Sequence, residues 1–331
     1  MTQQFRINAD GVSLAARTWG DPRNPALVLV HGYPDNHGVW RPVAEMLADS
    51  FYVIAYDVRG AGESDAPGRL RDYRMARLAA DLAAVVDGLI PGRGFHLAAH
   101  DWGSIQSWES VTTGPLKARI LSYTSLSGPC LDHMGYWMRD RLRGLSPNAF
   151  KQMASSWYIW MFQMPVVPEA VWQLAMGRLW PRYLEKREGV TEPHPNPTQT
   201  RDGRNGVRLY RANFMPKLMR PEPRYAVCPV LLIVPQRDNY VGTHLFDDLQ
   251  RWVPALYRQD IDASHWVLLS DPAEVAGRIR RFVTAVEEDN APTVLEAWRV
   301  TGVGRALLER VQGATKDTGA NGADRVVRAE T

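Results

Sequence analysis

Short apolar runs alternate with longer stretches of helical periodicity over the first part of the chain. Such short runs, set apart by turn-forming residues, are typical of strands that are buried on both faces of a parallel sheet. Between them, Val39–Leu47 and Met75–Leu89 repeat apolar residues at the three- to four-residue spacing of an amphipathic helix. This alternation predicts an α/β fold with a doubly wound, mostly parallel sheet. The expected strands are Ala26–Val30, Phe51–Tyr56, Phe95–Ala98 and Ile120–Ser125.

The alternation stops after Gly128, and residues 130–222 are instead rich in Trp, Met, Arg and Pro. We interpret residues 130–222 as a helical cap, or lid, inserted into an α/β-hydrolase-like core made of residues 1–129 and 223–287. The two halves of the core must then close into one sheet, with the cap over the edge where open α/β sheets bind ligands. Helices are expected in the cap at Ala154–Gln163 and Glu169–Leu179, and after the cap we expect strands at Pro229–Val234 and Leu256–Ile261 and a helix at Pro272–Val286.

Residues 288–331 form a C-terminal extension of different character. One helix is expected at Val294–Gln312, although Gly302 and Gly304 interrupt its pattern, and the remainder is rich in Gly, Ala, Asp and Thr, which predicts disorder. The segment Val300–Arg305 (VTGVGR) resembles the start of a dinucleotide fingerprint, but too few residues follow it for a βαβ unit. We interpret the match as chance and expect no nucleotide cofactor.

Charge and cysteine content narrow the choice of partner and compartment. The chain has 331 residues, with 39 basic against 36 acidic side chains and a net charge of +3, which disfavours nucleic acid or an anionic membrane as the main partner. No apolar run approaches the roughly 20 residues that span a bilayer, and Met1–Arg6 lacks the features of a secretory signal, so we expect a cytoplasmic protein. Cys130 and Cys228 have neither CxxC spacing nor a nearby His cluster, which predicts buried free thiols and no metal site.

The third expected strand leads into the sequence AHDWG (residues 99–103), which is followed by a helix. A nucleophile elbow needs small residues two places before and two places after its strained central residue, and this segment has them around Asp101. Ser104 is the weaker candidate nucleophile, because Trp102 and Gln106 would then stand where small residues are needed. A plain helix N-cap at Asp101 is the alternative interpretation, and it predicts no catalytic partners elsewhere.

Partners for Asp101 do follow the later strands. Asp238 comes after the strand Pro229–Val234, and His265 comes after the last expected strand. Nucleophile, acid and histidine in this order are typical of α/β-hydrolases. Asp132, which follows the strand Ile120–Ser125, is the other candidate for the relay acid, and we choose Asp238.

A fourth element follows the first buried strand. In His31-Gly32-Tyr33-Pro34, the backbone N–H of Tyr33 can join that of Trp102 to form an oxyanion hole, although an ordinary strand-to-loop turn explains the same residues.

The motifs HGYP (31–34), DVRGAGESD (57–65), HDWG (100–103) and SHW (264–266) give the chain a family resemblance. Over residues 5–287 it resembles the epoxide hydrolases of the α/β-hydrolase superfamily. It is most similar to the hydrolase half of mycobacterial proteins in which such a domain precedes a short-chain dehydrogenase domain. The dehydrogenase half is missing here, so nothing nicotinamide-dependent is expected.

The resemblance implies two lid tyrosines that hydrogen-bond the epoxide oxygen. Tyr158 precedes Phe-Gln-x-Pro by four positions, as in the first tyrosine segment of the family, and Tyr210 lies in LYRANF (209–214), which resembles the second segment. In the implied mechanism Asp101 opens the ring of a small hydrophobic epoxide to form an ester, and His265 then activates the water that hydrolyses it. No metal or organic cofactor is needed. We place Pro34, Trp160 and Trp266 against the substrate.

Two other functions remain open on the sequence. A haloalkane dehalogenase also uses an aspartate followed by tryptophan, but many dehalogenases have a halide-binding Asn where this chain has Tyr33, and they have no use for two lid tyrosines. A non-catalytic binding protein with a hydrolase fold is the alternative from another class. The oligomeric state is open too, with a homodimer as one candidate.

Overall fold

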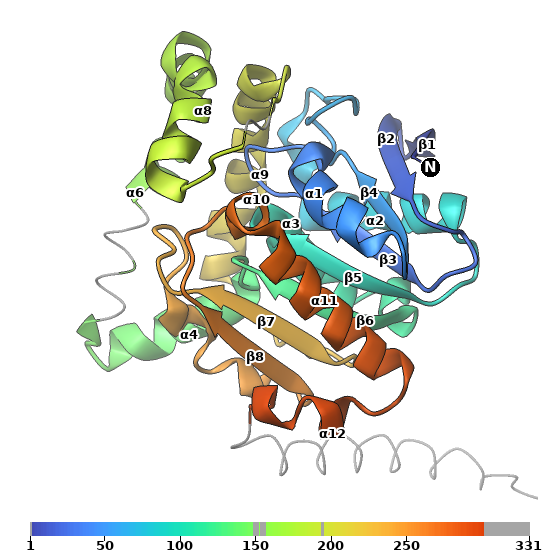
Figure 1. Cartoon of the computed structure of the whole chain (residues 1–331). Helices are drawn as coiled ribbons and strands as arrows, with labels where there is room; N and C mark the ends of the chain where they lie inside the picture. The colour runs from blue at the N-terminus through green and yellow to red at the C-terminus, as the bar shows by residue number, and fades with distance from the viewer. Residues whose placement is uncertain (1, 148–151, 153–156, 193–194, 301–331) are drawn as a thin grey trace, which may run out of the picture.

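The computed structural model describes residues 2–147, 152, 157–192 and 195–300. Figure 1 shows a twisted sheet with helices on both faces and a group of helices, from α6 to α9, gathered beyond one end of the strands. No helix in the described part of the chain combines the length and the apolar character needed to cross a membrane.

Within the described residues the sheet has eight strands, in the order β1-β2-β4-β3-β5-β6-β7-β8. Strand β2 pairs antiparallel with both β1 and β4, and the pairings from β4 to β8 are parallel, so the expected mostly parallel sheet is confirmed. The apolar runs revealed neither β1 nor β2, and the residues of β1 are mostly exposed or half-buried. The strands are β1 (Gln3–Ala9), β2 (Val12–Trp19), β3 (Ala26–Val30), β4 (Tyr52–Tyr56), β5 (Phe95–His100), β6 (Ile120–Leu126), β7 (Val230–Pro235) and β8 (Leu256–Ile261).

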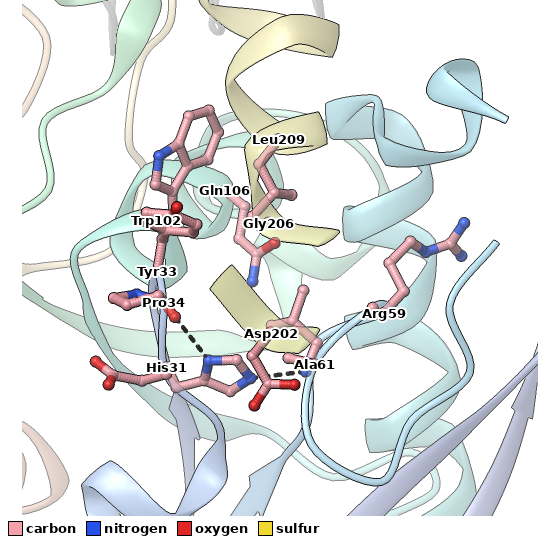
Figure 2. Close-up of a pocket in the computed structure, with 14 residues that line it drawn as sticks. His31, Tyr33, Pro34, Arg59, Ala61, Trp102, Gln106, Asp202, Gly206 and Leu209 are labelled. Atoms are coloured by element: carbon pink, nitrogen blue, oxygen red, sulfur yellow. Dashed lines mark hydrogen bonds between the residues drawn. The ribbon is translucent and has the colours of Figure 1, made fainter. Parts of the chain in front are cut away.

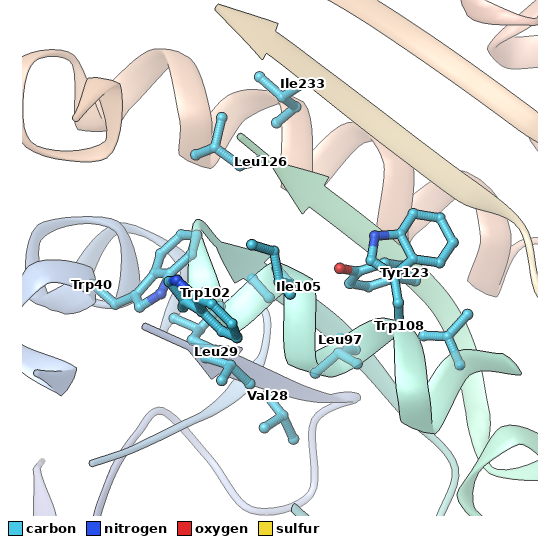
Figure 3. Packing of buried hydrophobic residues seen from close by; sticks show 14 of the residues in the cluster. Val28, Leu29, Trp40, Leu97, Trp102, Ile105, Trp108, Tyr123, Leu126 and Ile233 are labelled. Atoms are coloured by element: carbon cyan, nitrogen blue, oxygen red, sulfur yellow. The ribbon is translucent and has the colours of Figure 1, made fainter. Parts of the chain in front are cut away.

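The core lies between this sheet and helices that pack in pairs, α1 with α11 and α2 with α3. Every residue of β3, β4, β5 and β7 is buried, as expected for strands covered on both faces. Trp108 of α3 packs edge-on against Tyr123 of β6 with 5.0 Å between ring centroids, and Figure 3 shows both beside the apolar side chains of neighbouring strands. These helices are α1 (Arg41–Leu47), α2 (Met75–Leu89), α3 (Trp102–Thr112) and α11 (Pro272–Glu287).

Residues 131–219, which we call the helical insertion, lie between two strands that are neighbours in the sheet. β6 ends at Leu126 and pairs with β7, which begins at Val230, so the sheet closes across the insertion. From Val167 to Glu188 four helical segments follow one another directly, and two of them have the wider π-helical turn. The helices are α4 (Leu131–Arg143), α6 (Trp157–Gln163), α7 (Val167–Val171), η4 (Trp172–Met176), α8 (Gly177–Tyr183), η5 (Leu184–Glu188) and α9 (Gln199–Met219).

The C-terminal extension differs from its prediction in the part that is described. Instead of a helix that starts at Val294, helix α12 (Ala291–Val294) ends there, a 3-10 turn covers Glu296–Trp298, and Arg299 bridges to Tyr257 of β8. The prediction was wrong here because β8 is an edge strand with unpaired backbone groups, and the extended chain satisfies some of them. The rest of the expected helix, the predicted disorder and most of Val300–Arg305 fall outside the described residues.

Candidate active site

Asp101 stands alone between the end of β5 at His100 and the start of α3 at Trp102. Its backbone has φ 51° and ψ −125°, a strained conformation for a residue with a side chain. The turn also needs a small residue at Gly103, because a Cβ there would lie 2.2 Å from the carbonyl oxygen of Val30. The structure therefore has the local geometry of a nucleophile elbow with aspartate at its centre.

Two loops bring Asp238 and His265 to this elbow. His265 Nε2 lies 3.5 Å from Asp101 Oδ2, and His265 Nδ1 lies 2.8 Å from Asp238 Oδ2. The other oxygen of Asp238 accepts hydrogen bonds from the backbone N–H groups of Tyr240 and Val241, at 2.8 and 2.9 Å. All three members of this triad follow parallel strands at one edge of the sheet.

Asp132, the other candidate for the relay acid, lies in a different network. Its carboxylate is 3.0 Å from Lys217 Nζ and 3.3 Å from Arg224 Nε, and it accepts the backbone N–H of Glu222. These contacts tie α4 to the end of the insertion. The geometry thus favours Asp238 as the acid that orients His265.

The triad is buried, and its charges depend on one another. Burial by itself would lower the pKa of His265, yet the carboxylates of Asp238 and Asp101 raise that pKa well above its ordinary value. Burial likewise opposes the charge of Asp238, but His265 and the two N–H donors hold the pKa of Asp238 below its usual range. Any reaction that neutralises Asp101 removes one of the two charges that stabilise the His265 cation.

The turn after β3 supplies a hydrogen-bond donor to Asp101. The backbone N–H of Tyr33 donates to Asp101 Oδ1 at 2.7 Å. His31 holds the turn in place, because its Nε2 accepts the backbone N–H of Val58 at 2.9 Å, one of the contacts dashed in Figure 2. Trp102 is the first residue of α3, so its N–H is one of the donors that a helix leaves free at its start. Both expected oxyanion-hole residues therefore adjoin Asp101.

A cavity opens against Asp101 and is lined mainly by apolar side chains. Tyr158 from α6 and Tyr210 from α9 both line it, with their ring centroids 6.3 Å apart. Burial, reinforced by nearby charge, raises the pKa of both phenols, so their hydroxyl groups stay protonated and can donate hydrogen bonds. The cavity suits a small apolar molecule with an oxygen that needs hydrogen-bond donors.

The three residues placed against the substrate lie elsewhere. Pro34 lines the smaller cavity of Figure 2, behind the turn, together with Gln106 and Asp202. Trp266 is buried against His265, with ring centroids 4.5 Å apart, and does not line the cavity at Asp101. Trp160 is 55% exposed on the outer side of α6.

Tyr240, which contacts His265, and Asp35, which contacts the neighbouring Trp266, were not identified from the sequence. Tyr240 lines the cavity and packs against His265, with 5.0 Å between the ring centroids. Its position two residues after Asp238, on the same loop, was an available signal. Asp35 accepts the indole N–H of Trp266 at 2.8 Å, and burial raises the pKa of Asp35 to about 7. Asp35 directly follows the HGYP motif, so its place in the sequence was informative too.

Glu188 is a further residue that sequence reasoning missed. It lies at the end of η5, only 2% exposed, and accepts the backbone N–H of Trp266 at 3.4 Å. Burial raises the pKa of its carboxyl group. The helical insertion therefore contacts the histidine loop directly. No local motif marks Glu188, because the contact depends on how the insertion folds over the core.

Comparison with known proteins agrees with this fold. The α/β hydrolase fold family matches residues 25–272. A protein of Mycobacterium tuberculosis named probable oxidoreductase EphD is 35% identical over 283 residues, which cover 82% of this chain and 48% of that protein. The chain thus spans about half the length of these mycobacterial relatives. Epoxide hydrolase 3 of Xenopus tropicalis is 27% identical over 84% of this chain and 77% of its own length.

Among solved structures, an epoxide hydrolase from Bacillus megaterium is similar, with a TM-score of 0.72. It is 22% identical, and the match covers 85% of this chain and 100% of the other. At this identity the likeness shows the fold alone.

Proposed function

Because the chain belongs to the α/β-hydrolase fold family, we propose that it is an epoxide hydrolase, which converts an epoxide and water to a vicinal diol through an ester on Asp101. One observation carries the proposal: a strained elbow holds an aspartate, not a serine, against a cavity that two protonated tyrosines line. The names of several relatives agree with it.

The two oxygens of Asp101 have different surroundings, which assigns their roles. Oδ1 accepts the N–H of Tyr33 and is held in the oxyanion hole, so it becomes the carbonyl oxygen of the ester. Oδ2 is the oxygen that attacks a ring carbon, and the carbon–oxygen bond of the epoxide breaks with its electron pair going to oxygen. Tyr158 and Tyr210 donate hydrogen bonds to the alkoxide oxygen that the opened ring leaves, and one of the two phenols gives its proton to that oxygen.

Formation of the ester prepares the second step. The charge of Asp101 disappears when the ester forms, so the pKa of His265 falls and the imidazole can act as a base. His265 takes a proton from water, and the hydroxide adds to the ester carbonyl while the N–H groups of Tyr33 and Trp102 stabilise the oxyanion. Collapse breaks the ester bond and releases the alkoxide of the diol, which takes the proton from His265. The carboxylic acid that remains on Asp101 returns its proton to the tyrosinate left by the first step, which restores both the carboxylate of Asp101 and the phenol.

A single turnover in ¹⁸O water tests the proposal. With styrene oxide as substrate, we expect the label in the carboxylate of Asp101, because water attacks the ester carbonyl and not the substrate carbon. Labelled diol with unlabelled Asp101 would mean direct hydration and would reject the ester.

Two comparisons complete the experiment. A bromoalkane offered in parallel should release no bromide, and bromide release without diol formation would favour a dehalogenase. Asp101→Asn is the matched control because it keeps the size of the side chain and removes the nucleophile. If no epoxide of a broad panel gives diol and the bromoalkane gives no bromide, a non-catalytic binding protein would be favoured.

A further inference from the structure

The continuous helix from Val167 to Glu188 has two faces of different character. Its inner face buries Trp172, Trp180 and Leu184 against the rest of the protein. Its outer face begins with the exposed residues Val167, Val171 and Leu174, which are spaced four and three positions apart and so lie on one side of the helix. Leu174 is 78% exposed, so this apolar side faces away from the protein.

Helix α6 extends the same apolar surface. It packs against α7, and its outer positions Trp157, Trp160 and Met164 are all exposed, the first of them by 64%. Val166, between the two helices, is exposed as well. We call the seven residues together the apolar cap face: Trp157, Trp160, Met164, Val166, Val167, Val171 and Leu174.

Charge is almost absent from the apolar cap face itself. Glu169 is the acidic residue within residues 157–177, and Arg211 neutralises it through an ion pair. A contiguous apolar surface of this kind is uncommon on a monomer and marks an interaction site. Figure 1 shows the helices from α6 to α8 projecting beyond one end of the sheet.

Basic side chains border this face. After Leu174 the helix carries four exposed cations and one exposed acid, Glu185, and the four cations make no ion pair with any described residue. Arg204 approaches from α9 and donates to Gln173, next to Leu174, at 2.9 Å. The net charge of +3 hides this asymmetry, because residues 130–222 carry 14 basic against 8 acidic side chains. The four cations are Arg178, Arg182, Lys186 and Arg187.

We propose that the apolar cap face docks on an anionic lipid surface. Tryptophan is enriched where proteins meet the bilayer interface, and an apolar helix face bordered by Lys and Arg is typical of helices that lie in that interface. A second copy of the chain fits less well, because a two-fold interface would bring the same basic border close to itself. Helix α6 carries Trp157 outward and Tyr158 inward, so docking places the cavity one helix away from the lipid.

Flotation with vesicles tests this docking on the full chain. We expect binding to vesicles of phosphatidylcholine with phosphatidylglycerol, weaker binding to phosphatidylcholine alone, and loss of the difference at high salt. Arg178→Glu with Arg182→Glu should weaken binding to the anionic vesicles at least tenfold, since each basic residue near such a surface contributes roughly fivefold. Arg69→Glu with Arg71→Glu, on exposed residues of the core, is the control and should bind like the natural sequence.

The apolar contribution to binding is tested separately with the pair Val171→Glu and Leu174→Glu. The control pair is Met46→Glu and Val294→Glu, at apolar side chains that are exposed elsewhere on the protein. We expect loss of vesicle binding in the first pair alone, with circular dichroism and turnover of a water-soluble epoxide unchanged in both pairs. Equal binding by all variants would overturn the proposal. So would a dimer in light scattering that Leu174→Glu dissociates, combined with no vesicle binding by the natural sequence, because the occupant would then be a second copy.

Discussion

At the scale of single residues, the proposed mechanism gives Asp101 and His265 separate chemical steps. Ester formation needs the Asp101 carboxylate and hydrogen-bond donors, whereas ester hydrolysis needs a base. We therefore expect His265→Gln to trap the ester. Mass spectrometry should find the protein heavier by one substrate, on the peptide that contains Asp101. An unmodified protein that still consumes epoxide would contradict the assignment of His265.

The charges around His265 also predict a pH dependence. In the free protein Asp238 and Asp101 raise the pKa of His265 well above its ordinary value, and in the ester only Asp238 remains charged. The neutral imidazole is the base, so ester hydrolysis should rise with pH along a limb that lies below the pKa of His265 in the free protein. We expect the pKa of His265 in the free protein to exceed the pKa that governs ester hydrolysis by at least about one unit. NMR titration of the free protein and single-turnover ester hydrolysis at several pH values give the two numbers, and equal values would contradict the coupling.

Asp238 and Asp132 form a matched pair of buried carboxylates, because one orients His265 and the other holds Lys217 and Arg224. Asp238→Asn should slow ester hydrolysis by about a hundredfold or more while the ester still forms. Asp132→Asn should lower the free energy of unfolding by about 1–3 kcal/mol and leave turnover within a fewfold of the natural value. Thermal melting and rapid-quench kinetics separate the two effects. Loss of turnover in Asp132→Asn alone would reverse our choice of relay acid.

At the scale of elements, the insertion shows how tertiary packing sets where a helix ends. The helical pattern Glu169–Leu179 stops before Pro181, because proline inside a helix removes a hydrogen bond and usually ends it. In the structure the helix continues to Glu188, with wider turns on both sides of α8 and a buried inner face that stabilises it. Tertiary packing decides this outcome, and local sequence does not contain that information.

The end of that helix predicts a link between the insertion and catalysis. Glu188→Ala removes the acceptor for the N–H of Trp266, next to His265, so we expect ester hydrolysis to slow about tenfold while ester formation keeps its rate. Glu188→Gln keeps an oxygen acceptor and should restore most of the rate, but it removes a nearby carboxylate and should lower the pKa of His265. Pre-steady-state kinetics over a pH series measures both quantities. If Glu188→Ala and Glu188→Gln both hydrolyse the ester like the natural sequence at every pH, the contact between Glu188 and Trp266 does not position His265.

At the scale of the whole molecule, the site residues divide into those that the sheet positions and those that the insertion positions. Asp101, Asp238 and His265 could be predicted because each follows a strand of the sheet, and the ends of parallel strands meet at one edge. Tyr158 and Tyr210 came only from the family resemblance, since no strand fixes the insertion over the core. The same uncertainty explains how the sequence could place Trp160 against the substrate, although the residue lies on the outer surface of α6.

The two tyrosines test whether insertion and core form one active site. Tyr158→Phe and Tyr210→Phe each keep the aromatic packing and remove one donor, so each should slow ester formation by about ten- to a hundredfold. The double variant should be nearly inactive, because either phenol alone still stabilises the alkoxide in part. Rapid-quench measurement in the His265→Gln background isolates the first step, and Tyr225→Phe, on an exposed tyrosine, is the control. Undiminished ester formation in the double variant would remove the insertion from the chemistry and leave Asp101 to open the ring with donors from the core alone.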